Sequence, residues 1–127
     1  MTEERPRDRL GRPLPVGAET DAPPVPSIDG LSDPEVWRLA ASLMDEGLPF
    51  HAHEVCESRW RESAAHERDL WRALAQWGAA RTHEARGNSV GAQRVAARAL
   101  ATLDGADSVP AGVDVAAVRA DCRRLAG

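Results

Sequence analysis

Two stretches decide the fold: Phe50 to Trp60, which reads FHAHEVCESRW, and Gln76 to Asn88, which reads QWGAARTHEARGN. Both have the residue spacing of helices. A helix advances about 100° per residue, so residues three, four and seven apart share one face. On that spacing His53 and Glu57 fall within an apolar stripe of the first stretch, and Glu54 lies at its edge.

The second stretch carries a polar face of its own. Gln76, Ala80 and His83 recur at positions i, i+4 and i+7, and further alanines flank them. Small residues allow a neighbouring helix to approach closely. If the two helices pack antiparallel, we expect His53, Glu57, Gln76 and His83 to meet between them as a buried polar cluster, with Trp60 beside it.

This cluster has two interpretations. In the structural one, Glu57 accepts a hydrogen bond from an imidazole N–H and the network fixes the register of the helices, because an unpaired buried carboxylate is costly. In the functional one, His53, Glu57 and His83 bind a divalent metal such as zinc, manganese or iron. Glu54 would then act as general base on metal-bound water. The spacing alone leaves both open.

The same residues carry a family resemblance. The sequence resembles domain-of-unknown-function family 309 (DUF309), a small all-helical family of bacteria and archaea, over roughly residues 33–103. The positions that match are Phe50, His53, Glu54, Glu57 and Trp60, followed by Gln76, His83, Gly87 and Asn88. Trp77 and Gly78 depart from the aliphatic residues that are usual after the glutamine, and Cys56 from a larger aliphatic residue. The family is described as a predicted metal-dependent hydrolase, so the resemblance implies a helical fold and a metal site.

Composition limits the classes of function. A chain of 127 residues predicts one domain. The net charge of −4 argues against a nucleic-acid or membrane-surface partner. No apolar run approaches the ~20 residues of a membrane span, and no signal segment opens the chain. Cys56 and Cys122 lie on apolar helix faces and are predicted to be buried free thiols. We therefore expect a soluble cytoplasmic protein.

The chain divides into a tail and a helical domain. Residues 1–30 hold six of the nine prolines and few large apolar side chains, which predicts a flexible or extended tail. The alternative is that the tail lies across the helices or a neighbouring subunit, with the segment around Ile28 docking. Residues 31–127 are predicted to form an all-α bundle of about five helices.

Capping residues and apolar periodicity place these helices. Ser32 and Glu35 resemble a capping box, Gly47 and Gly87 fit helix ends, and Asp114 fits an N-cap. Asn88 or Ser89 is expected to begin the fourth helix. The predicted helices span about 33–46, 49–62, 67–86, 89–103 and 115–125, with Ser63 to Ala65 as a link.

We expect an uncharacterised helical protein with a structural or interaction role. The alternative is a metal-dependent hydrolase that uses His53, Glu57 and His83 as ligands and Glu54 as base. A third hypothesis is a ligand pocket with Trp60 and Trp77 as its walls. Beyond the divalent metal no cofactor is predicted. A homo-oligomer and an unknown protein or small-molecule partner stay open.

Overall fold

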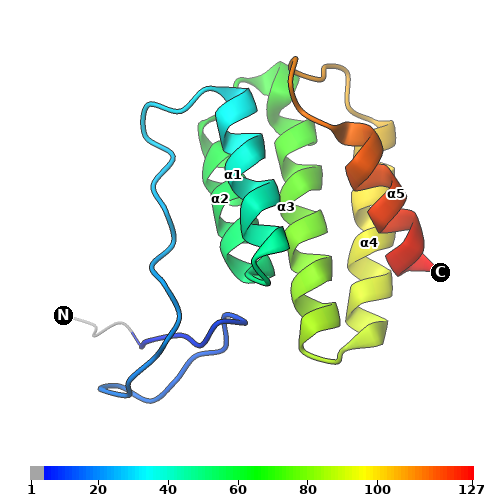
Figure 1. Ribbon diagram of the computed structural model, residues 1–127. Coiled ribbons are helices and arrows are strands. Elements are labelled where there is room, and N and C mark those ends of the chain that lie inside the picture. Colours follow the sequence, from blue (N-terminus) through cyan, green and yellow to red (C-terminus); the bar gives the residue numbers. More distant parts are fainter. Residues whose placement is uncertain (1–4) are drawn as a thin grey trace.

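The chain folds as an all-α bundle (Figure 1), seen in a computed structural model that describes residues 5–127. Those residues contain no β-strand, although one isolated bridge joins Arg7 and Pro13. None of their helices combines the length and the apolar character that crossing a membrane requires. The helices are α1 (Asp33–Asp45), α2 (Pro49–Glu62), α3 (Ala65–Ala85), α4 (Ser89–Asp104) and α5 (Val115–Ala126).

The predicted helix caps are confirmed. Ser32 and Glu35 form a complete capping box at α1. The side chain of Asn88 accepts a hydrogen bond from a backbone N–H of the first turn of α4, and Asp114 does the same at α5. Gly47, just after α1, has a φ of 77°, a conformation that favours glycine. Local capping chemistry therefore places most of the helix ends.

The link between α2 and α3 is short. Ser63 and Ala64 are extended, with ψ values of 145° and 156°, and α3 begins at Ala65 instead of near the predicted Glu67. The Ser63 hydroxyl donates to the carbonyl of Arg59, so a local hydrogen bond supports the end of α2. A link of two residues forces α2 and α3 into an antiparallel hairpin.

Helix α3 is central in the bundle. It packs on α2, α4 and α5 (Figure 1), and Leu70, Trp71 and Leu74 are fully buried. Trp77 of α3 stacks on Trp37 of α1 with ring centroids 5.7 Å apart. Small residues fill much of the remaining core; the fully buried alanines are Ala40, Ala52, Ala73, Ala80, Ala96 and Ala99. The two cysteines, Cys56 and Cys122, are buried and free, as predicted.

The tail before α1 is irregular but makes contacts with the helices. Residues 1–4 of the predicted tail lie outside the described residues. Ile28 is 5% exposed and joins the core, which agrees with the alternative interpretation of this segment, in which it docks on the helices. The ring of His51 donates through Nε2 to the carbonyl of Pro23 at 2.7 Å. Val16 and Val25 of the same tail are exposed.

Candidate functional site

The candidate site lies along the groove between α2 and α3. These helices run antiparallel, so the first turns of α2 lie beside the second half of α3. Gly78 of α3 sits directly against the backbone of His53 of α2, leaving no room for a side chain. The close approach places the carbonyl of Ala75 within hydrogen-bond distance of the His53 ring.

His53 has both ring nitrogens opposite oxygen atoms. Its Nδ1 lies 2.7 Å from the carbonyl oxygen of Ala75, and because a carbonyl accepts only, Nδ1 carries a hydrogen. Its Nε2 faces Glu57 Oε2 at 3.0 Å and Glu54 Oε1 at 4.0 Å. The donor atoms of His53, Glu54 and Glu57 all lie within 4.8 Å of one another. One imidazole and two carboxylates thus converge, the mixture of ligands that zinc, manganese and iron accept.

The carboxylate of Glu57 lies between His53 and Arg61. One oxygen faces His53, and the other accepts a hydrogen bond from Arg61, one turn further along α2. The Glu57 side chain is 22% exposed and that of His53 is 24% exposed. The acidic group is therefore half-buried at the edge of an open groove, where sequence analysis expected it to be enclosed.

A first cavity, the Glu57 cavity, opens beside this group. Its volume is about 240 Å³, and it is lined by His53, Glu57, Trp60, Arg72, Ala75, Gln76 and Ala79. Trp60 forms one wall. The Oε1 atom of Gln76 is buried and has no hydrogen-bond partner among residues 5–127. The structure thus brings three of the four predicted cluster residues, His53, Glu57 and Gln76, to one cavity.

The fourth residue, His83, lines a separate cavity. This His83 cavity has a volume of about 160 Å³ and is lined by Phe50, His53, Ala79, Thr82, His83 and Arg86. His53 and Ala79 stand between the two cavities. The residues whose donor atoms converge are therefore His53, Glu54 and Glu57, and His83, the third residue of the predicted metal set, lines the other cavity. Glu54, which was predicted as the general base, is one of these three converging residues.

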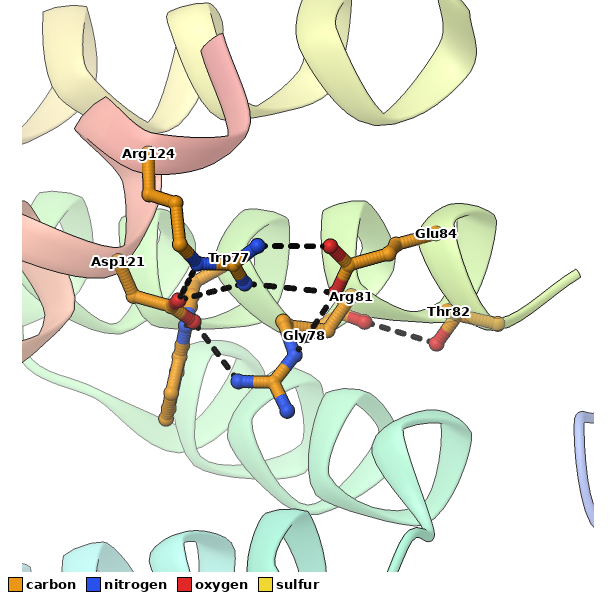
Figure 2. A network of polar contacts seen from close by, with 7 residues as sticks. All are labelled: Trp77, Gly78, Arg81, Thr82, Glu84, Asp121 and Arg124. Carbon is orange, nitrogen blue, oxygen red and sulfur yellow. Dashed lines mark hydrogen bonds and ion pairs between the residues drawn. The ribbon is translucent and has the colours of Figure 1, made fainter. Parts of the chain in front are cut away.

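Trp77 does not line the groove, so the structure does not place it opposite Trp60 as a pocket wall. Its Nε1–H donates to Asp121 of α5 at 2.8 Å, on another side of α3. Arg81 and Arg124 also donate to Asp121, and Arg124 continues to Glu84 (Figure 2). This network fastens α5 to α3.

Burial by itself would raise the pKa of Asp121. The hydrogen bonds from Trp77, Arg81 and Arg124 outweigh burial and hold the pKa below its usual value. Sequence reasoning missed this network because Trp77 and Asp121 are 44 positions apart. No residue spacing connects them.

Comparison with known proteins identifies one family. Residues 37–95 match the model of a family described as "Domain of unknown function (DUF309)". The match covers both stretches that form the groove. Searches of curated proteins and of solved structures give no match.

Proposed function

Residues 37–95 of this chain match the DUF309 family, and we propose that the groove between α2 and α3 binds a divalent cation through His53, Glu54 and Glu57. The observation that carries this proposal is the orientation of His53. Its Nδ1–H is engaged by the Ala75 carbonyl, so in the neutral ring the lone pair of Nε2 points toward two carboxylates.

The donor set fits such a cation. Metal-binding histidines nearly always donate their second ring N–H to a carbonyl or carboxylate, which fixes the tautomer and the ring orientation. Ala75 supplies that carbonyl from the neighbouring helix. Glu54 and Glu57 would supply hard oxygen ligands from the same helix as His53. Glu54 is the next residue along α2, and Glu57 is one turn further on. Three protein ligands leave further coordination positions open, which is typical of a catalytic site.

Hydrolysis is the reaction class that this arrangement supports. A bound cation would supply Lewis acidity to water or to a substrate oxygen. Glu54 is the most exposed carboxylate of the group and the furthest from His53 Nε2, at 4.0 Å. Its carboxylate is therefore the ligand that we expect an incoming water or substrate to meet first, while His53 is held by Ala75 and Glu57 by Arg61. Trp60 and Ala79 give the Glu57 cavity apolar walls for the non-reacting part of a substrate.

A structural role is the second candidate, and the Glu57 contacts favour it. Glu57 pairs with both His53 and Arg61, so its charge is compensated without any metal. His53 in turn reaches α3 through Ala75. The same residues thus link α2 to α3, and this link would fix the register of the two helices.

Cation binding distinguishes the two candidates. Isothermal titration with Zn²⁺ and with Mn²⁺ should show one site in the wild-type protein, and His53→Ala should remove it. Because a ligand that binds only the folded state stabilises it by RT ln(1 + [L]/Kd), a free ion concentration of 100 times Kd should add about 2.7 kcal/mol to the unfolding free energy.

His66→Ala is the matched control, since the His66 side chain is 68% exposed and lies outside the group. It should bind as the wild type does. His83→Ala should also retain the site, because His83 lines the other cavity. If the wild-type protein binds neither ion and a chelator does not change its stability, the structural role is the only candidate that remains.

A further inference from the structure

Asn88 connects the start of α4 to His83 of α3. Its side-chain Oδ1 accepts a hydrogen bond from the backbone N–H of Gly91 at 2.9 Å, which caps α4. Its side-chain Nδ2 lies 3.2 Å from Nδ1 of His83. One amide group thus serves the helix cap and the histidine together.

This geometry fixes the position of the proton on His83. The Gly91 N–H is a donor, so the atom facing it must be the amide oxygen of Asn88. The amide nitrogen then faces His83, and because it can only donate, His83 Nδ1 must accept. In the neutral ring the hydrogen therefore resides on Nε2. If Nδ1 were protonated as well, its N–H would face the N–H of the Asn88 amide. Turning the amide round to avoid this would remove the hydrogen bond that caps α4.

Gly91 leaves the space for this arrangement. A Cβ atom at Gly91 would lie 2.6 Å from Asn88 Nδ2 and 2.9 Å from His83 Nδ1. Any side chain there would separate the amide from the ring. The contact thus depends on three residues, His83, Asn88 and Gly91, from α3, the turn and α4.

The polar side chains that line the His83 cavity are His53, Thr82, His83 and Arg86. The Thr82 hydroxyl is occupied with the Gly78 carbonyl, and Arg86 donates through Nε and Nη2 to the carbonyl of Leu10. Nε2 of His83 has no hydrogen-bond partner within residues 5–127. No carboxylate lines this cavity, in contrast to the Glu57 cavity beside it. A ligand placed here meets the Nε2–H of His83, the positive charge of Arg86 and the apolar ring of Phe50.

We propose that the His83 cavity binds a small oxyanion, a carboxylate or phosphoryl group, through the Nε2–H of His83 beside Arg86, and that Asn88 is the positioning residue that fixes this tautomer. A metal at His83 Nε2 would require the hydrogen on Nδ1, against the Asn88 amide. The cavity of about 160 Å³ has room for such a group. The proposal does not depend on a cation at Glu57, because no acidic residue contributes to this cavity.

The tautomer is read directly by long-range ¹H–¹⁵N spectra of the imidazoles. They are recorded without metal at about pH 8, above the ordinary histidine pKa near 6.5. In the wild type, His83 should show an unprotonated Nδ1 and a protonated Nε2. Asn88→Asp keeps a capping oxygen for α4 but presents an acceptor to Nδ1, so it should move the hydrogen to Nδ1. Asn88→Ser keeps a cap without charge and should give a mixture of the two tautomers.

Binding is tested in the same spectra with inorganic phosphate and, separately, with acetate as probes. The His83 signals should shift and saturate with at least one probe, while those of His66 stay unchanged. The probe that binds more tightly identifies the phosphoryl or the carboxylate class. Asn88→Ser should weaken binding by about tenfold, the expected size for a misplaced hydrogen bond to a charged group. A wild-type His83 with its hydrogen on Nδ1, or one that responds to neither probe, would overturn the proposal.

Discussion

Gly78 of α3 touches the backbone of His53 of α2: a Cβ atom at Gly78 would lie 2.6 Å from the Cα atom and 2.8 Å from the backbone nitrogen of His53. The nearest atoms belong to the main chain, so they cannot rotate away. This contact sets the distance between the two helices. It therefore also determines the hydrogen bond between His53 and Ala75, and this bond orients the His53 ring in the proposed cation site.

Gly78→Ala should consequently destabilise the protein. On an open helix surface this change would stabilise by roughly 0.5–1 kcal/mol, but here the added methyl group must separate α2 from α3. Overpacking of this kind costs about 1–3 kcal/mol, which chemical denaturation measures. Gly105→Ala is the control, because a Cβ atom there would meet its nearest neighbour at an ordinary 3.7 Å. Equal stability of the two variants would contradict the close contact.

Asp121→Asn tests the network that fastens α5. Asp121 accepts hydrogen bonds from Trp77, Arg81 and Arg124, and we expect its loss of charge to cost about 1–3 kcal/mol at neutral pH. Asp104→Asn is the control. Asp104 pairs with Arg119, but its side chain is 70% exposed, so the loss of this pair should cost less than about 1 kcal/mol.

The pH dependence of the Asp121→Asn effect has a definite sign. The pKa of Asp121 is lowered in the folded protein, because the hydrogen bonds from Trp77, Arg81 and Arg124 outweigh burial. The carboxylate therefore stabilises fully above the unfolded pKa of 3.8 and loses that contribution as pH falls below it. Unfolding curves of wild type and variant should converge in acid. A difference that grew on acidification would be inconsistent with the network.

The tail is held at Phe50 and Arg86, two residues that also line the His83 cavity. Gly11 is buried against the Phe50 ring with a φ of 78°, and a Cβ atom there would lie within 2.2 Å of that ring. Arg7 lies over the same ring at 5.3 Å, and Arg86 donates to the carbonyl of Leu10. These contacts hold the start of the tail against α2 and the residue that follows α3.

Gly11→Ala should therefore release the start of the tail from the helices. We expect faster proteolysis and faster amide exchange in residues 5–14, with exchange in α3 and α4 unchanged. Gly17→Ala is the matched control: its φ is 82°, but a Cβ atom there meets nothing within 4 Å. The control carries the same backbone strain without the clash, so similar proteolysis of both variants would argue against the Phe50 contact.

The two thiols should resist alkylation in the native protein. Burial raises the pKa of Cys56 to about 12, and that of Cys122 to about 11, where the Asp121 charge adds to burial. The thiolate is the reacting form, so both cysteines should be far less reactive with iodoacetamide at neutral pH than a free thiol. Mass spectrometry of native and urea-unfolded protein measures this difference. Rapid native labelling of Cys56 would show that α2 opens readily.

Much of the fold could be predicted because helix ends are local. The capping box at Ser32 and the caps at Asn88 and Asp114 depend on residues three positions apart, and the structure confirms them. The start of α3 was less certain because Ala64 provides no side-chain cap, so nothing in the sequence marks it.

The site was predicted only in part, because helical spacing gives the face of a residue and not the direction of its side chain. His53 and Glu57 share a cavity as expected. His83 shares the same face of α3 as Gln76, yet it lies two turns further along and reaches a different cavity. Glu54 enters the ligand group by side-chain orientation, which no pattern encodes.

The most direct test of the account is a crystal structure of the protein grown with Zn²⁺, using anomalous scattering to locate the ion. We predict a peak about 2.0–2.1 Å from His53 Nε2, the usual Zn–N distance, with Glu57 and Glu54 oxygens as further ligands and Nδ1 still bonded to Ala75. A peak at His83, or a groove without any peak while His53 remains paired with Glu57, would contradict the account.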